Sequence, residues 1–185
     1  MHLFTRFSDY QHRLSVLSES ISNLEIDQIL SEISALSSRS GKLFVAGNGG
    51  SAATSLHFAT DLRIISQRRG VTINVECLAA NVSSLTAIGN DDSFDNIFVK
   101  QISGQLTKND IVFVISVSGN SPNLVNLVDY ATKSGAKTIG LLGTDGGQLK
   151  NRLDFSCHVK SGPTEYGPVE DIHIAICHFI SLSVK

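Results

Sequence analysis

Residues 43–53, LFVAGNGGSAA, decide the fold class of this chain. The stretch begins as an apolar run, which is typical of a strand buried on both faces of a sheet, and continues into glycines and a serine. Residues 111–121, IVFVISVSGNS, follow the same plan. A strand that leads through such a loop into a helix presents free backbone N–H groups to an anion, and serine hydroxyls add small neutral donors. The two stretches therefore predict a phosphate-binding site with hydroxyls from Ser51, Ser116, Ser118 and Ser121.

Strand and helix patterns alternate on both sides of these stretches. We expect strands over 42–46, 72–78, 110–116, 137–142 and 155–159, and helices over 51–65, 82–88, 92–106, 121–134 and 169–184. Gly135 suits a left-handed end to the helix before it, and residues 143–147, GTDGG, predict a turn. This alternation predicts an α/β fold, a three-layer doubly wound sheet of five parallel strands that binds its ligand at the carboxyl ends of the strands.

The first forty residues carry a different pattern. Apolar residues recur every three or four positions from Phe4 to Leu36, which predicts amphipathic helix with a break between Asn23 and Asp27, Asp27 capping the second part. Such an arm packs either against a partner subunit or back on its own sheet. We expect one domain over residues 1–185, with a helical arm over 1–40 and an α/β core over 41–185.

Charge and composition argue against two kinds of partner. The chain has 185 residues and a net charge of −2, which does not suit a nucleic-acid surface. Its apolar stretches are strand-length, short of the roughly 20 residues of a membrane span, and residues 1–7 lack the pattern of a secretory signal. The cysteines are far apart in sequence, so we expect reduced thiols that act as small buried hydrophobes, in a cytoplasmic protein. They are Cys77, Cys157 and Cys177.

Neither loop matches a nucleotide-binding motif. Residues 47–51, GNGGS, lack the Gly-Lys-Ser/Thr of a Walker loop, and Ala53 stands where G-x-G-x-x-G needs its last glycine. One alternative is a tight strand-to-helix turn without a ligand. The second serine-rich loop favours a monoester phosphate on a small metabolite, held by neutral donors.

Histidines and carboxylates at helical spacing predict a metal site. His57 and Asp61 are four residues apart, which puts them on one helix face with about 6 Å between their Cβ atoms. Glu170 and His178 of the last helix complete a set that suits a divalent ion such as zinc. The alternative for the first pair is a half-buried histidine hydrogen-bonded to a carboxylate one turn away.

The spacing of the last helix sets a condition on that site. Glu170 and His178 are eight residues apart, about 12 Å of rise. Both can reach one metal ion only if Glu170 precedes the first turn of the helix or comes from another subunit. His173 lies about 140° around the helix from His178, so we expect it to be structural.

Six short motifs together resemble one known family. They are residues 46–51 (AGNGGS), 57–59 (HFA), 87–91 (AIGND), 116–121 (SVSGNS), 143–147 (GTDGG) and 170–174 (EDIHI). Over nearly its whole length the chain resembles the phosphoheptose isomerases of the SIS (sugar isomerase) domain class. The resemblance implies a flavodoxin-like SIS sheet and a homotetramer whose active sites are lined by neighbouring subunits.

The resemblance also implies roles for individual residues. It implies one zinc ion per subunit and a catalytic pair, Asp61 and His178. The implied metal residues are His57, Asp61, Glu170 and His178. The implied substrate-binding residues are Asn48, Gly49, Gly50, Ser51, Asn90, Asp91, Ser116, Val117, Ser118, Ser121 and Glu170.

Three positions depart from the family pattern. Asp61 stands where the family has a glutamate, one methylene longer, and Glu170 stands where it has a glutamine. Gly167 and Pro168 replace an Asp-Arg pair that many members carry. The additional negative charge of Glu170 should tighten metal binding or raise a neighbour's pKa. These changes bear on which sugar is the substrate rather than on the type of chemistry.

The expected activity is the isomerisation of a ketose phosphate to an aldose phosphate. The resemblance favours sedoheptulose 7-phosphate converted to D-glycero-D-manno-heptose 7-phosphate through an enediol, for lipopolysaccharide or for capsule or S-layer glycans. Proton transfer between adjacent carbons needs two groups that exchange protons near neutrality. Two alternatives remain: a non-catalytic SIS regulator, such as one of replication initiation, and an isomerase of arabinose 5-phosphate or of a hexosamine phosphate.

Overall fold

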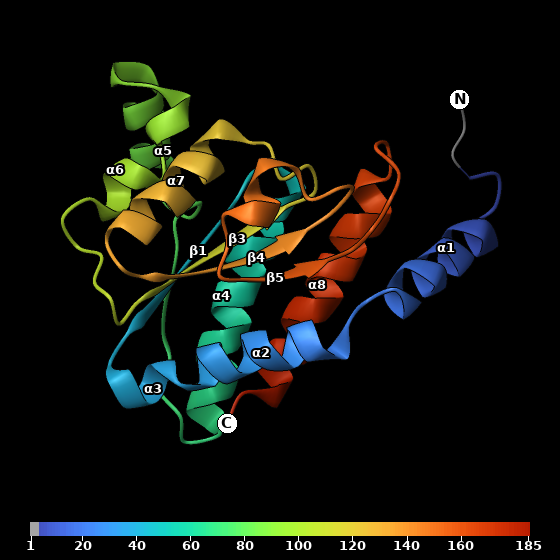
Figure 1. The fold of residues 1–185 in the computed structure, drawn as a ribbon, viewed down its shortest axis with the longest axis horizontal. Helices are drawn as coiled ribbons and strands as arrows, with labels where there is room; N and C mark the ends of the chain where they lie inside the picture. The colour runs from blue at the N-terminus through green and yellow to red at the C-terminus, as the bar shows by residue number, and fades with distance from the viewer. Residues whose placement is uncertain (1–3) are drawn as a thin grey trace.

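The computed structural model describes residues 4–185, and its centre is a parallel β-sheet (Figure 1). Within these residues, five strands pair in the order β2-β1-β3-β4-β5, and every pairing is parallel. The strands are β1 (Lys42–Gly47), β2 (Asn74–Cys77), β3 (Ile111–Ser116), β4 (Lys137–Leu142) and β5 (Phe155–His158). The predicted five-stranded α/β fold is confirmed. In this order β2 lies on one side of β1 and β3 lies on the other. The connections that follow β1 and β3 therefore go to opposite faces of the sheet, and a crevice opens between the loops after these two strands.

Helices cover both faces of the sheet (Figure 1). One face carries α2 (Asn23–Ser34), α4 (Gly50–Arg68) and α8 (Tyr166–Ser183). The other carries α5 (Val82–Asp91), η1 (Phe94–Asn96), α6 (Val99–Ile102), α7 (Pro122–Lys133) and η2 (Gly147–Asn151). The remaining helices are α1 (Phe7–Glu19) and the single turn α3 (Leu36–Arg39).

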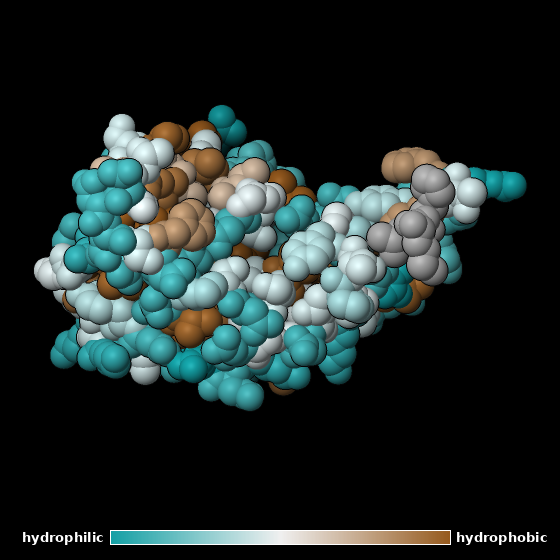
Figure 2. Space-filling model, turned by 90° about the horizontal axis from the view of Figure 1, so that it is seen from above, coloured by the Kyte–Doolittle hydropathy of each residue, from teal (hydrophilic) through white to brown (hydrophobic). Residues whose placement is uncertain are grey.

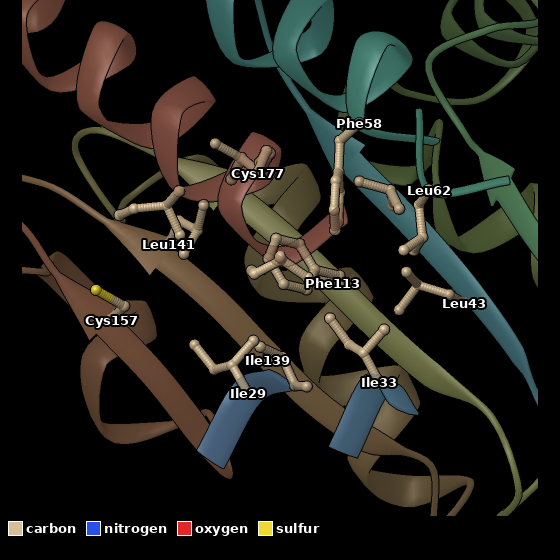
Figure 3. Packing of buried hydrophobic residues seen from close by; sticks show 14 of the residues in the cluster. Ile29, Ile33, Leu43, Phe58, Leu62, Phe113, Ile139, Leu141, Cys157 and Cys177 are labelled. Atoms are coloured by element: carbon tan, nitrogen blue, oxygen red, sulfur yellow. The ribbon is translucent and has the colours of Figure 1, made fainter. Parts of the chain in front are cut away.

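Alternation along each strand divides the apolar side chains between two cores. Phe113 of β3 points to the α4 side, where its ring lies 5.2 Å from that of Phe58 (Figure 3). Its neighbours Val112 and Val114 point to the α7 side. Because side chains alternate between the faces of a strand, the continuous apolar run predicted a strand buried on both faces, and β3 is buried at every position.

The helix predicted over residues 92–106 is wrong. The structure has the short elements η1 and α6 there, because polar side chains bond to the local backbone in place of a helical ladder. Ser93 accepts from the Asp95 amide at 3.1 Å and caps η1. Gly104 follows with a left-handed φ of 79°. The other helices and the strands differ from prediction only in their ends, and Gly135 takes the expected left-handed conformation after α7.

The last helix begins at Tyr166, three residues before the predicted start. Pro168 falls in the first turn of α8, where no backbone N–H has a partner within the helix, so it does not interrupt the helix. Glu170 therefore lies inside α8. The condition that it precede the first helical turn is not met.

The N-terminal arm divides into two helices with different surroundings. The break falls at residues 20–22, and Ser22, not Asp27, caps α2 by accepting from the Glu25 amide. Helix α2 folds back on its own sheet and buries Ile26, Ile29 and Ile33. Helix α1 packs against α8 and projects beyond the sheet (Figures 1 and 2). Packing on its own sheet is thus confirmed for α2, and packing of the arm against a partner subunit stays a prediction. Residues 1–3 of the predicted arm lie outside the described residues.

The three cysteines are free thiols. Cys157 and Cys177 are buried, as predicted, and burial raises the pKa of Cys157 to about 12. Cys77 is half-buried. Among residues 4–185, no helix combines the length and apolarity needed to cross a membrane.

Candidate active site

The loops after β1 and β3 face each other across one pocket of about 230 Å³. We call it the loop pocket. Its lining contains most of the residues expected to bind substrate, at the edge of the sheet where the strand order reverses. The lining residues are Asn48, Gly49, Gly50, Ser51, Ile115, Ser116, Val117, Ser118, Ser121, Leu124, Tyr166 and Glu170.

The first loop contributes mainly backbone groups. Gly49 takes a left-handed φ of 55° directly before α4, which lets the chain turn sharply into the helix and leaves the first helical N–H groups at the pocket. The Asn48 amide is engaged elsewhere: it donates to Asn123 Oδ1 at 2.9 Å and accepts from Asn123 Nδ2 at 3.0 Å. This pair ties the first loop to the first turn of α7. Asn48 is therefore first of all a structural link at the edge of the pocket.

The second loop contributes hydroxyls. Ser116 Oγ accepts from the Gly119 amide at 3.0 Å, and Ser118 Oγ accepts from the Asn120 amide at 3.3 Å. Neither hydroxyl donates to an acceptor within residues 4–185, so each keeps its hydrogen for a ligand. Ser121 precedes α7, and Pro122 occupies the first helical position. The hydroxyls and the start of α7 thus offer several donors to one anion.

Glu170 belongs to the loop pocket. A Cβ atom on Gly50 would collide with the Glu170 carboxylate, so this carboxylate lies directly over the start of α4. Burial, with a smaller contribution from Asp171, raises the pKa of Glu170. Only glycine at position 50 leaves room for this approach.

His57, Asp61 and His178 form a second group, the histidine cluster. The two Nε2 atoms lie 2.9 Å apart, and Asp61 Oδ2 lies 3.2 Å from that of His57 and 3.7 Å from that of His178. Ligands of a tetrahedral zinc ion at about 2.05 Å are about 3.3 Å apart. The three atoms lie within 4.8 Å of one another, and the donors are those that zinc prefers. The cluster therefore fits a zinc ion.

The loop pocket and the histidine cluster occupy different places along the same two helices. His57 is seven residues beyond Gly50 on α4, about 10 Å, and His178 is eight beyond Glu170 on α8, about 12 Å. Helices α4 and α8 pack side by side, so the two sites are separated along their length (Figure 1). The structure brings together three of the four predicted metal residues and places Glu170 at the loop pocket instead.

Two predicted substrate residues lie away from the loop pocket. Asn90 and Asp91 are the last residues of α5, on the opposite face of the sheet from α4 and α8. Both are exposed, and the Asn90 amide donates to Asp91 Oδ1 at 2.7 Å. Neither lines the pocket of its own chain.

Four residues near the pocket were not predicted. Ile115 is the last apolar residue of β3, Leu124 and Asn123 lie in the first turn of α7, and Tyr166 starts α8. No motif marked them, although Asn123 lies within two residues of the serine loop. Tyr166 also lines a neighbouring hollow with Thr144, Asp145 and Ser161. His173 is fully buried, which agrees with the structural role expected for it.

Comparisons with known proteins identify relatives of the whole architecture. A family model described as SIS domain matches residues 7–143. A phosphoheptose isomerase of Nitratiruptor sp. is 40% identical over 141 residues, covering 75% of this chain and 73% of the relative. One of Geobacter sulfurreducens is 42% identical over 141 residues, covering 75% and 72%. The solved structure of a phosphoheptose isomerase from Francisella tularensis superposes with a TM-score of 0.86 at 27% identity, over 95% of this chain and 92% of that one.

Proposed function

Because the chain belongs to the SIS domain family, among its phosphoheptose isomerases, we propose that it converts sedoheptulose 7-phosphate into D-glycero-D-manno-heptose 7-phosphate. The observation that carries this proposal is the loop pocket, in which two helix N-termini and the serine hydroxyls meet at one edge of the sheet. A sugar phosphate matches these donors. The expected membership of the phosphoheptose isomerases is confirmed by relatives at about 40% identity.

The phosphate binds at the serine loop in this proposal. Ser116, Ser118 and Ser121 donate from their hydroxyls, at the positive end of the α7 dipole. Backbone groups of Gly49, Gly50 and Ser51, with Val117, line the path of the sugar. Among residues 4–185, no lysine or arginine lines the pocket, so the phosphate is held by neutral donors and the helix dipoles and remains free to leave as product.

Asp61 and His178 move the protons. Aldose–ketose interconversion transfers a proton between adjacent carbons through an enediol, so one group must remove a proton and another return it. Asp61 Oδ2 and His178 Nε2 lie 3.7 Å apart, which lets both face one bound carbon pair. His57 contacts both and orients them.

Zinc is the metal that we propose for the histidine cluster, one ion per subunit. His57, Asp61 and His178 would hold it, and when bound it would supply a positive charge that stabilises developing negative charge on the substrate oxygens. Metal ligation and proton transfer compete for the same lone pairs, so Asp61 and His178 would exchange protons only through atoms that the ion leaves free. Glu170 can join this set only from another subunit, since its own chain places it about 12 Å along the helix from His178.

A homotetramer with shared active sites accounts for the separation of the two sites. Helix α5 has no buried residue although it carries Val82, Leu85 and Ile88, and its start at Val82 is 68% exposed. Figure 2 shows apolar residues gathered on the part of the molecule away from α1. The α4 and α8 surface also exposes Ile64 and Phe179. A partner on these surfaces would cover them and could bring Asn90 and Asp91 to a neighbouring loop pocket.

We place the reaction in the cytoplasm, in heptose synthesis for lipopolysaccharide or capsule. The free thiols support a reducing compartment. No nucleic acid or membrane partner is part of this proposal.

The first test is turnover of sedoheptulose 7-phosphate by zinc-loaded protein in deuterated water, followed by NMR. We expect an aldoheptose 7-phosphate with deuterium at the carbon next to the carbonyl. If the tetrameric, zinc-loaded protein yields neither product nor exchange, the isomerase proposal is wrong, and binding of the sugar without exchange would favour a regulator.

A further inference from the structure

Helix α1 contacts the first turns of α8 at two points. The Arg13 guanidinium donates to Glu165 through Nε at 2.6 Å and through Nη2 at 2.8 Å, a bidentate ion pair. One turn earlier on α1, the Tyr10 hydroxyl donates to Asp171 Oδ2 at 2.6 Å. The two contacts span 152 and 161 residues of sequence. They fix the projecting helix to one short part of α8.

Glu165 is the centre of the first contact. It immediately precedes α8, is only 9% exposed, and accepts a third hydrogen bond from the Gly162 amide at 2.6 Å. The Arg13 guanidinium lowers the pKa of this carboxylate, with help from the Gly162 amide. Without Arg13, a buried carboxylate would lose its positive partner, and the cost of that loss is largest for buried charges. Glu165 would then move toward water and take the start of α8 with it.

The part of α8 that these contacts hold is one wall of the loop pocket. Tyr166 follows Glu165 directly, and Glu170 precedes Asp171. Tyr10 also approaches the helix backbone, since a Cβ on Gly167 would lie 3.6 Å from its hydroxyl. Burial and the neighbouring Asp171 and Glu170 carboxylates raise the pKa of Tyr10 to about 12, so its hydroxyl stays a neutral donor. Tyr166 and Glu170, the two pocket residues of α8, are thus each next to a residue that α1 holds in place: Glu165 and Asp171.

We propose that Arg13 and Tyr10 are positioning residues for substrate binding: they hold the first turns of α8 so that Tyr166 and Glu170 face a sugar phosphate in the loop pocket. This proposal rests on the proposed isomerase function for its substrate. Neither residue touches the reacting atoms. Their effect therefore falls on substrate affinity rather than on proton transfer.

The test compares Arg13→Gln with a matched ion-pair variant, Arg152→Gln. Arg152 also pairs with a carboxylate, since its Nη1 donates to Asp129 Oδ1 at 2.7 Å and to Oδ2 at 2.9 Å, and neither residue lines the pocket. For sedoheptulose 7-phosphate we expect Arg13→Gln to raise KM about tenfold with kcat within about twofold, and Arg152→Gln to change neither. Arg13→Lys should recover part of the affinity, because a lysine restores the charge without the bidentate geometry. A KM for Arg13→Gln within twofold of that for Arg152→Gln would overturn the proposal.

A second measurement is independent of turnover. We expect faster amide hydrogen exchange over residues 160–170 in Arg13→Gln than in the parent or in Arg152→Gln, since the Gly162 amide loses a fixed acceptor. If hydrogen exchange over these residues is unchanged, the positioning role of Arg13 is wrong. This result does not depend on whether the parent isomerises sedoheptulose 7-phosphate, so the positioning proposal and the isomerase proposal can fail independently. Tyr10→Phe removes one hydroxyl and serves if Arg13→Gln does not fold. It should raise KM about threefold, and an unchanged KM with unchanged exchange would count against the proposal.

Discussion

The loop pocket and the histidine cluster both use residues of helices α4 and α8, but they differ in how far a single chain encloses them. The pocket is formed by backbone groups and hydroxyls of two loops that one chain closes around a cavity. The histidine cluster is an exposed group of side chains, in which His57 and His178 are 48% and 46% exposed. The donors that we propose for the phosphate therefore all belong to one chain, whereas the chemistry that we propose requires another surface to cover the cluster. Four variants or conditions can separate the two sites.

The largest effect should come from removing the Asp61 carboxylate. We expect Asp61→Asn to lower kcat about 10³-fold, or about 4 kcal/mol, because the proton-transfer pair loses one member. Binding of sedoheptulose 7-phosphate, measured by calorimetry, should stay within about threefold, since the loop pocket is intact. Asp129→Asn is the matched control. If Asp61→Asn and His178→Gln both keep turnover within about tenfold of the parent, the assignment of the catalytic pair is wrong.

Acid should destabilise the fold through His173, which lies on the buried side of α8 between the two sites. Burial lowers the pKa of His173 from about 6.5 to about 4. The unfolded chain therefore binds a proton that the folded chain does not, and stability falls as the pH drops from about 6.5 to about 4. The loss reaches at most about 3 kcal/mol.

Urea unfolding at pH 7 and pH 5 measures this loss. His173→Gln should reduce the difference between the two pH values, and His12→Gln, at an exposed position on α1, should leave it unchanged. An equal pH dependence in all three proteins would show that His173 is not the source of the acid destabilisation.

Zinc should stabilise the protein through the cluster alone. At about 100 times its Kd, a ligand that binds only the folded state adds about 2.7 kcal/mol, which corresponds to a rise in Tm of about 5–10 °C. His57→Gln should lose most of this rise and His12→Gln none of it, as read by calorimetry of metal-free and zinc-loaded protein. A full zinc response in His57→Gln would place the metal elsewhere.

The smallest effect should come from crowding the loop pocket. Gly50→Ala places a methyl group against the Glu170 carboxylate, and we expect KM to rise about tenfold, or about 1.4 kcal/mol, with kcat little changed. A double-mutant cycle with Glu170→Ala checks the cause. If the collision is responsible, Gly50→Ala should cost nothing further once Glu170 is truncated, and an additive result argues against it.

Much of the fold could be predicted because its signals are local. The apolar runs of β1 and β3 and the loops after them read directly as strand, turn and helix start, and the loop pocket formed where the parallel order requires. The helix expected over 92–106 failed because Ser93 and its neighbours bond to nearby backbone, which apolar spacing does not reveal. Tyr166 was missed because it belongs to no motif.

The fold class, the family and the nature of the donors could be predicted from the chain alone: hydroxyls and glycines for an anion, histidines and a carboxylate for a metal. These follow from residue type and short-range spacing. The grouping of the donors, in contrast, came from the three-dimensional fold. It placed Glu170 at the pocket and not at the cluster, joined Asn48 to Asn123, and brought Arg13 to Glu165. Such pairings depend on where helices start and how they pack, and the local sequence carries no record of a contact between residues 152 positions apart.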